Sequence, residues 1–209
     1  MERAIKKRLA VLVSGAGTNL QAILDAAAGP SYPAEVVLVM SDRDGVAALD
    51  RSAAAGVESV VVRLEDHADR DAFTRACVSA LEKHAVELVV TAGYMKLFAP
   101  SMFERFPRIL NVHPSLLPAF PGYAKKVLRD TLAYGVKVTG VTIHFLEDGT
   151  DTGPVVFQEA VAVEDGDSPE SLHARLQVVE HRLLPDAVRL MAEEKLTLDG
   201  RRVRIQSGT

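Results

Sequence analysis

The chain has little cysteine, no surplus of basic charge and no long apolar run, and each shortage excludes a class of protein. The single cysteine, Cys77, excludes an intramolecular disulfide and fits a reducing compartment. Lys and Arg number 24 against 28 Asp and Glu, so the broad basic surface that neutralises nucleic-acid phosphates is not indicated. No stretch approaches the ~20 apolar residues of a membrane span. We therefore expect a cytoplasmic protein that binds neither nucleic acid nor membrane.

Short, almost continuously apolar runs alternate with longer segments rich in Ala and Leu. Such runs are typical of parallel strands covered on both faces, so the rhythm favours an α/β fold: a doubly wound, mostly parallel sheet with helices on both faces. The expected strands are 9–13, 36–40, 57–62, 88–92, 109–112, 138–145 and 155–160, with an edge strand at 203–205. The expected helices are 19–28, 46–55, 69–84 and 168–192. With 209 residues and no convincing linker, we predict a single domain.

The stretch SGAGTNLQ, residues 14–21, follows the first expected strand and opens the first expected helix. Backbone N–H groups at such a junction point at whatever lies before the helix, where the helix dipole favours an anion. The glycines allow close approach, and Thr18 and Asn19 add side-chain donors. Leu20 stands where a dinucleotide fingerprint needs a third glycine, and the Gly-Lys-Ser/Thr of a P-loop is absent. The turn therefore indicates a site for one terminal phosphate, with a tight turn that binds nothing as the alternative.

The stretch ILNVHPSLLPAFPG, residues 109–122, ends a strand and continues through three prolines. Alternate residues of a strand point to the same side, so Asn111 and His113 should project together at the carboxyl edge of the sheet, where open α/β folds bind ligands. A carboxamide beside an imidazole can stabilise an oxyanion in acyl transfer, and the imidazole can move a proton near neutral pH. The prolines would fix the exit path of the chain. A core histidine bonded to backbone is the alternative.

The stretch HFLEDGTDTGPVVFQ, residues 144–158, supplies a third group for this edge. Asp151 lies in a loop that can reach His113, where a carboxylate would raise the pKa of the imidazole and could accept a proton through water. A metal site made of His113, His144 and Asp151 lacks any spaced ligand motif, so we expect no metal. The Gly-x-Ser-x-Gly motif of serine hydrolases is also missing.

Four segments together resemble the folate-dependent formyltransferases. They are Ser-Gly-x-Gly-x-Asn-Leu-Gln at 14–21, Ala-Gly-Tyr-Met at 92–95, Asn-Val-His-Pro-Ser-Leu-Leu-Pro at 111–118 and Asp-Thr-Gly-Pro at 151–154. The resemblance extends from Val11 to about Ile205. It implies a Rossmann-related formyltransferase domain over 1–209, with a nucleotide-binding half of about 1–105 and a folate-binding and catalytic half of about 106–209. It also implies a monomer or homodimer that acts on small molecules.

The resemblance implies a reaction and a catalytic trio. The formyl group of the cosubstrate 10-formyltetrahydrofolate would be transferred to the amine of glycinamide ribonucleotide, a step of purine biosynthesis. Asn111 and a protonated His113 would stabilise the oxyanion of the tetrahedral intermediate. Asp151 would orient a water and His113, keep the imidazole charged and help to take the proton that the amine loses.

The resemblance also assigns the binding residues. Those for the ribonucleotide are Gly17, Thr18, Asn19 and, at the glycinamide end, Glu180. Those for folate are Arg70, Tyr94, Met95, Lys96, Leu97, Phe98, Leu146, Glu147, Asp148 and Thr150. Without the resemblance, the apolar members of the folate set would be assigned to the core, since apolar residues after a strand usually belong there. Glu180 would be assigned to the surface.

One segment departs from the family, and three other functions compete. After Pro121-Gly122 the family usually has a His, whereas here the sequence continues Tyr123-Ala124-Lys125-Lys126-Val127, so no role of that His carries over and solvated helix lysines are expected.

A formyltetrahydrofolate hydrolase would carry an extra amino-terminal domain, for which a first strand at about residue 9 leaves no room. A methionyl-tRNA formyltransferase would need a further carboxy-terminal domain and a basic surface. A noncatalytic nucleotide- or folate-binding module would have no reason to keep the whole trio.

Overall fold

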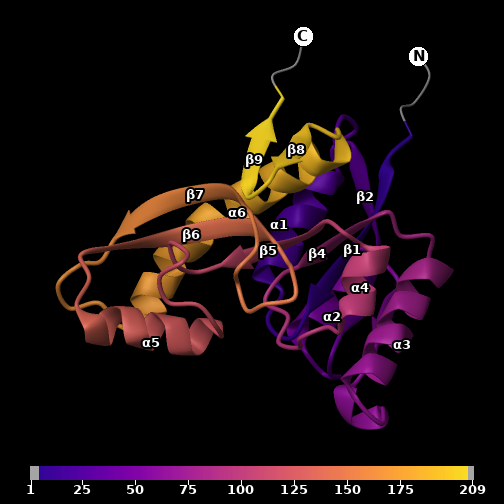
Figure 1. Cartoon of the computed structure of the whole chain (residues 1–209), viewed down its shortest axis with the longest axis horizontal. Coiled ribbons are helices and arrows are strands. Elements are labelled where there is room, and N and C mark those ends of the chain that lie inside the picture. Colours follow the sequence, from indigo (N-terminus) through magenta and orange to yellow (C-terminus); the bar gives the residue numbers. More distant parts are fainter. Residues whose placement is uncertain (1–4, 207–209) are drawn as a thin grey trace.

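The structure, a computed structural model, describes residues 5–206 and centres on a seven-stranded sheet with helices on both faces (Figure 1). The strands are β1 (Lys7–Val13), β2 (Ala34–Ser41), β3 (Ser59–Val61), β4 (Leu88–Thr91), β5 (Ile109–His113), β6 (Val138–Phe145) and β7 (Val155–Ala162). The helices are α1 (Thr18–Ala27), α2 (Ala47–Ala54), α3 (Arg70–Lys83), α4 (Pro100–Arg105), α5 (Ala124–Tyr134) and α6 (Pro169–Ala192), with a 3₁₀ turn, η1, at Leu64–Asp66. The predicted α/β class is confirmed.

The order of the strands determines where a ligand can bind. The sheet runs β3-β2-β1-β4-β5-β6-β7; the pairs from β3 to β5 are parallel, and β6 and β7 are antiparallel additions. The chain moves outward from β1 to β3 and then returns to β4 on the other side of β1. In open α/β sheets such a reversal opens a crevice outside the carboxyl ends of the strands. The conspicuous segments after β1 and β4, and the end of β5, all lie at this edge.

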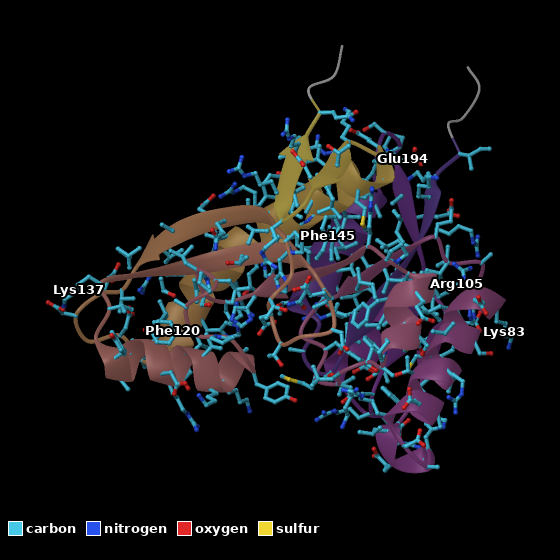
Figure 2. The ribbon with its side chains drawn as sticks, in the orientation of Figure 1. Lys83, Arg105, Phe120, Lys137, Phe145 and Glu194 are labelled. Carbon is cyan, nitrogen blue, oxygen red and sulfur yellow. The ribbon has the colours of Figure 1, made fainter. Side chains whose placement is uncertain are left out.

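Two apolar cores hold the sheet between its helices. Leu20 of α1 and Leu176 of α6 pack on one face, and Phe73 of α3 and Met102 of α4 pack on the other. Because both faces are covered, residues 9–13 of β1 are fully buried, which explains their uninterrupted apolar sequence. Each buried Leu or Val side chain among them contributes about 1.5–3 kcal/mol to folding. Figure 2 shows the labelled charged side chains at the periphery and Phe145 in the interior.

Helix α6 begins as the sequence predicts and carries a site residue toward α1. Ser168 accepts a hydrogen bond from the backbone N–H of Ser171 (3.2 Å), and the Ser171 hydroxyl accepts one from the Ser168 N–H (3.0 Å), which forms a capping box. Pro169 occupies the first turn, as expected. The helix crosses α1, so Glu180 lies on its buried side.

Three details differ from the sequence-based expectations. Strand β3 is shorter than the predicted 57–62. The predicted edge strand at 203–205 does form within β9 (Arg202–Ile205), but it pairs with β8 (Leu196–Asp199) in a separate two-stranded sheet, because Gly200, at φ 58°, closes a tight hairpin. Helix α4 was not predicted, whereas α5 carries Lys125 and Lys126, which were expected on a helix. Among residues 5–206, no helix is both long and apolar enough to cross a membrane.

Candidate active site

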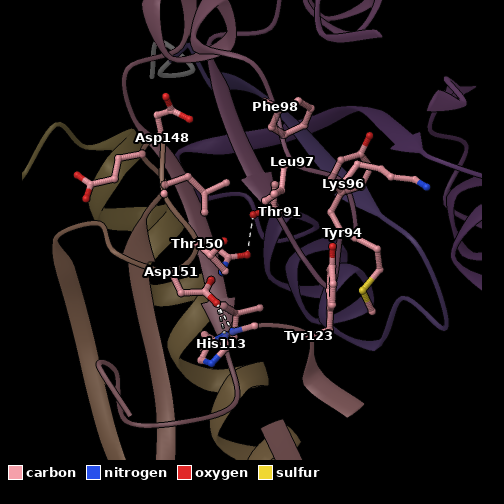
Figure 3. Close-up of a pocket in the computed structure, with 18 of the residues that line it drawn as sticks. Thr91, Tyr94, Lys96, Leu97, Phe98, His113, Tyr123, Asp148, Thr150 and Asp151 are labelled. Carbon is pink, nitrogen blue, oxygen red and sulfur yellow. Dashed lines mark hydrogen bonds and ion pairs between the residues drawn. The ribbon is translucent and has the colours of Figure 1, made fainter. Parts of the chain in front are cut away.

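The three residues predicted to act together lie together. Asn111 and His113 are on β5, and Asp151 is on the β6–β7 loop. The His113 Nδ1 lies 3.4 Å from the Asp151 Oδ2, and Figure 3 shows the two side chains facing each other at one side of a cavity. All three side chains line this cavity, as the same-side rule for alternate strand residues predicts.

The Asn111 carboxamide has hydrogen bonds at both ends. Its Oδ1 accepts from the Thr91 hydroxyl (2.7 Å), and its Nδ2 lies 3.0 Å from the His144 Nε2. The His144 Nδ1 lies 2.9 Å from the Phe145 carbonyl, which can only accept, so Nδ1 carries the hydrogen and Nε2 accepts from Asn111. Since Nδ2 carries two hydrogens and has no other partner among the described residues, one hydrogen is available to a ligand in the cavity.

His113 is buried and oriented by backbone. Its Nε2 donates to the Phe120 carbonyl (2.9 Å), and its side chain is 3% exposed. Burial lowers the pKa of His113, and the Asp151 carboxylate and the Phe120 carbonyl raise it only in part, so the pKa lies below its ordinary value. Asp151 thus acts in the expected direction, but burial outweighs it. The lowered pKa favours a neutral imidazole at neutral pH before substrates bind, and the protonated His113 that the resemblance implies for the intermediate stays a prediction.

Asp151 remains ionised in the same environment. Burial would raise its pKa, but His144 and His113, when they carry a positive charge, and the backbone N–H of Gly122 hold the pKa below its ordinary value. The Oδ2 accepts from the Gly122 N–H (2.7 Å), and the Oδ1 lies 3.6 Å from the His144 Nε2. The residue itself adopts a left-handed backbone conformation at φ 55°. The site therefore holds a carboxylate beside a neutral imidazole.

The proline-rich loop after β5 is held on the neighbouring strands by hydrogen bonds. The Thr142 hydroxyl of β6 donates to the Ser115 carbonyl (2.6 Å), and the Gln158 amide of β7 donates to the Leu117 carbonyl (2.8 Å). This path brings the Phe120 carbonyl to His113 and the Gly122 N–H to Asp151. The loop thus supplies one backbone partner to each member of the imidazole–carboxylate pair.

The Asp-Thr-Gly-Pro segment has a steric requirement of its own. A Cβ at Gly153 would lie 1.7 Å from the Phe145 carbonyl oxygen, so a side chain is excluded there. The Phe145 N–H donates to the Pro154 carbonyl (2.9 Å). The loop therefore lies directly against the end of β6, which places Asp151 at the cavity.

The cavity has a volume of about 330 Å³ and contains every predicted folate residue. Tyr94 stacks on Phe98, with ring centroids 5.4 Å apart, and Phe98 is 4% exposed whereas Leu97 is 54% exposed. The apolar wall therefore belongs to both core and cavity. Sequence reasoning missed several further lining residues: Thr91, Gly93, Phe103, Val112, Gly122, Tyr123 and Ala124. The pairing of parallel β4 with β5 could have indicated Thr91, and antiparallel pairing of β5 with β6 could have indicated His144.

The predicted ribonucleotide residues form a second polar cluster, where α1 meets α6. Asn19 Nδ2 donates to Glu180 Oε2 (2.7 Å), and Gln177 donates to the Thr18 hydroxyl (3.1 Å). Gly17 caps α1 at φ 70°, and a Cβ there would lie 2.7 Å from the Ala48 Cβ. Side chains of α1 and α6, which are far apart in the sequence, are thus joined by direct hydrogen bonds.

Glu180 is buried, which corrects the surface position that its local sequence suggests. Its residue is 4% exposed, and burial raises its pKa above the ordinary value, although Asn19, His173 and His181 act in the opposite direction. A second buried acceptor, the Asn19 Oδ1, has no hydrogen-bond partner among the described residues. The cluster therefore has unmet capacity to bind a polar ligand.

Two remaining expectations concern lysines and metals. Lys125 and Lys126 are exposed on α5, and Lys126 pairs with Asp130, so neither reaches the cavity, whereas Tyr123 and Ala124 line it. Over residues 5–206, no group of three or more His, Cys, Asp or Glu side chains is arranged to hold a metal ion. The absence of a resident metal stays a prediction.

Comparisons with known proteins agree with this geometry. The family model described as Formyl transferase matches residues 7–188. The phosphoribosylglycinamide formyltransferase of Mycobacterium tuberculosis is 50% identical over 195 residues, which are 93% of this chain and 89% of that protein. The crystal structure of glycinamide ribonucleotide transformylase 1 from Symbiobacterium toebii has a TM-score of 0.93 and 46% identity, covering 97% of this chain and 95% of its own. A formyltetrahydrofolate deformylase from Pseudomonas syringae shares the fold, with a TM-score of 0.89 at 22% identity, covering 99% of this chain and 68% of its own.

Proposed function

Because this chain belongs to the formyl transferase family, we propose that it moves the formyl group of 10-formyltetrahydrofolate to the amine of glycinamide ribonucleotide. The products are formylglycinamide ribonucleotide and tetrahydrofolate, in de novo purine biosynthesis. The observation that carries this proposal is the juxtaposition of Asn111, His113 and Asp151 at a cavity that contains all the residues expected to bind folate. A similar M. tuberculosis protein with this activity in its name supports it.

The two substrates occupy two adjoining regions. Folate binds in the cavity, between the segment after β4 and the β6–β7 loop. The ribonucleotide binds along the N-terminus of α1, where backbone N–H groups and the helix dipole favour its phosphate, with Glu180 at the glycinamide end. The regions are linked, because the Ser14 hydroxyl of the first turn accepts a hydrogen bond from the Met95 N–H in the cavity wall (2.9 Å).

The formyl oxygen gains negative charge when the amine nitrogen attacks the formyl carbon. The second hydrogen of the Asn111 Nδ2 donates to this oxygen. A preorganised donor of this kind contributes about 2.7–4 kcal/mol to the transition state, equivalent to roughly 100- to 1000-fold in rate. Thr91 and His144 hold the carboxamide in place throughout.

One proton must move during transfer. The attacking nitrogen, as a free amine, loses it, and N10 of tetrahydrofolate gains it when the carbon–nitrogen bond breaks, so transfer from the free amine releases no proton. The His113 imidazole, neutral at rest, takes up the proton directly or through water, and the Asp151 carboxylate balances the imidazolium. Negative charge on the formyl oxygen favours the same charged state. The protonated His113 implied by family resemblance is thus a state of the reaction rather than of the resting protein.

Several further features belong to the same proposal. The reaction takes place in the cytoplasm, uses folate as cosubstrate and no metal, and involves neither nucleic acid nor membrane. The single cysteine and the acidic composition support this view. The chain works as one domain, and as a monomer or homodimer. A division into two halves near residue 105 stays a prediction. Both halves contribute to the folate cavity, because Arg70 and residues 93–98 line it together with residues 146–151.

The alternative is hydrolysis of the formyl group by water, and the fold shared with the P. syringae deformylase is the observation that favours it. A spectrophotometric assay of purified protein with a 10-formyl folate, with and without glycinamide ribonucleotide, separates the two. We expect turnover only when the ribonucleotide is present, and its loss in His113→Ala and Asp151→Asn. Loss of the formyl group without the ribonucleotide would establish the hydrolase. Binding of folate without any turnover would indicate a binding module.

A further inference from the structure

The Asn111 carboxamide can stabilise an oxyanion only when its Nδ2, and not its Oδ1, faces the reacting oxygen. The two ends of a carboxamide are nearly equal in size and shape, so packing alone does not select the orientation. Hydrogen bonds select it, because the oxygen only accepts and the nitrogen only donates. The partners of Asn111 therefore decide whether the site can work.

On the nitrogen side, His144 selects the orientation. It is fully buried on β6, directly opposite Asn111 in the antiparallel ladder. Its Nδ1 hydrogen is directed to the Phe145 carbonyl, so its Nε2, 3.0 Å from the Asn111 Nδ2, accepts and excludes an amide oxygen at that position.

On the oxygen side, Thr91 provides the partner. It ends β4, pairs with Asn111 in the parallel register and is 2% exposed. Its hydroxyl lies 2.7 Å from the Asn111 Oδ1 and 3.3 Å from the Leu110 carbonyl, so the shorter bond to Asn111 receives the hydroxyl hydrogen. Without that donor, the Asn111 Oδ1 would be an unsatisfied acceptor at a site shielded by two strands.

We propose that Thr91 is a positioning residue for formyl transfer, which holds and polarises the Asn111 carboxamide so that Nδ2 donates to the formyl oxygen. A hydrogen bond to Oδ1 draws electron density from the amide and makes the Nδ2 hydrogens stronger donors, since linked hydrogen bonds reinforce one another. The inference rests on the proposed function, but the state of the carboxamide is observable without turnover.

Three variants test this role. Thr91→Val removes the hydroxyl and keeps the branched shape, and Thr91→Ser keeps the hydroxyl. Thr131→Val is the matched control, because Thr131 is also buried and its hydroxyl has no hydrogen-bond partner within the described part of the chain. Each variant is measured for kcat, for KM of both substrates and for thermal stability.

We expect kcat of Thr91→Val to fall about 3- to 10-fold, the effect of one neutral hydrogen bond, while both KM values change less than about two-fold. Thr91→Ser and Thr131→Val should keep kcat within about two-fold of the parent. An unchanged kcat in Thr91→Val would overturn the proposal. So would equal losses in Thr91→Val and Thr91→Ser, or in Thr91→Val and Thr131→Val.

Nuclear magnetic resonance supplies a readout that does not depend on turnover. The Asn111 Nδ2 hydrogens should resonate upfield in Thr91→Val and stay in place in Thr91→Ser and Thr131→Val, because only the first variant loses the polarising bond. An unmoved resonance in Thr91→Val would overturn the proposal. If the parent protein shows no formyl transfer, the proposed function fails, and the resonance still tests the hydrogen bond.

Discussion

Asp151 and Glu180 are both largely buried carboxyl groups near histidines, yet their pKa values move in opposite directions. At Asp151, two histidines and the Gly122 N–H outweigh burial, so the pKa is lowered. At Glu180, burial outweighs the Asn19 amide and two histidines, so the pKa is raised. The two carboxyl groups therefore differ in how completely the protein itself compensates their charge.

The difference indicates different tasks. A carboxylate that its own protein compensates is ready to balance a cation that forms during reaction, which suits Asp151 beside a neutral His113. A carboxylate that lacks compensation gains most from a ligand with N–H donors, which suits Glu180 and the glycinamide end of the ribonucleotide. Sites in which environments drive titratable groups apart commonly divide acid–base and binding roles in this manner.

The largest expected effect is that of Asp151→Asn. The variant keeps the size of the side chain and an acceptor for the Gly122 N–H, but it removes the charge that balances the imidazolium. We expect kcat to fall on the order of 100- to 1000-fold with both KM values nearly unchanged. Steady-state kinetics test this. A loss below about five-fold would remove Asp151 from the proton transfer.

The same variant has a pH signature. A lowered pKa means that ionised Asp151 stabilises the fold above about pH 4 and that this stabilisation is lost as pH falls further. Asp151→Asn should therefore unfold with a weaker dependence on pH in the acid range, as followed by circular dichroism. An unchanged dependence would contradict the lowered pKa.

Glu180→Gln should separate binding from stability. We expect KM for the ribonucleotide to rise about 10-fold or more through loss of a charged hydrogen bond, with KM for folate unchanged. Because the pKa of Glu180 is raised, its contribution to stability is present in acid and lost as pH rises. The variant should therefore melt about 2 to 4 °C higher at neutral pH. A lower melting temperature would show that the buried charge is already well compensated.

Gly17→Ala should damage the ribonucleotide region through its backbone. The residue has φ 70°, and a Cβ would lie 2.7 Å from the Ala48 Cβ of α2. We expect a loss of about 1–3 kcal/mol of stability and a several-fold higher KM for the ribonucleotide, measured by denaturation and kinetics. Gly15→Ala is the control for stability, since a Cβ there meets nothing within 4 Å. Equal destabilisation in both variants would contradict the steric argument.

The smallest effect on kinetics is expected from Leu97 at the mouth of the folate cavity. Leu97 is 54% exposed, so Leu97→Ala should raise KM for folate about two- to five-fold and leave stability unchanged. Phe98→Ala, one residue further and 4% exposed, should instead cost about 3–5 kcal/mol of stability. Kinetics and denaturation of the pair test whether neighbouring wall residues divide binding and folding in this way.

The sequence predicts the parts of the site that depend on short-range pattern. Apolar runs gave the strands of the main sheet nearly in full, and alternation within β5 placed Asn111 and His113 on one side. The folate residues were assigned through the family resemblance, and each lines the cavity. Gly200 and Arg201 form the two-residue turn between the paired residues Asp199 and Arg202, and without that turn the sequence analysis expects an edge strand at 203–205 but no strand β8 to pair with it.

The rest depends on long-range packing that no local pattern encodes. Burial decides the neutral state of His113, and the extent of burial follows only from the assembled loops. The local sequence of Glu180 indicates a surface residue, and only the packing of α6 against α1 buries it beside Asn19. Thr91 and His144 were missed because their roles arise from the register of β4, β5 and β6, which the sequence does not specify.

The most direct test is a carbon-13 nuclear magnetic resonance titration of both carboxyl groups in one unliganded sample, with Asp151→Asn and Glu180→Gln to assign the signals. We expect the pKa of Asp151 to lie below the ordinary value for aspartate and that of Glu180 to lie above the ordinary value for glutamate. Shifts in the same direction, or in the reverse directions, would contradict the division of charge on which the proposed mechanism depends.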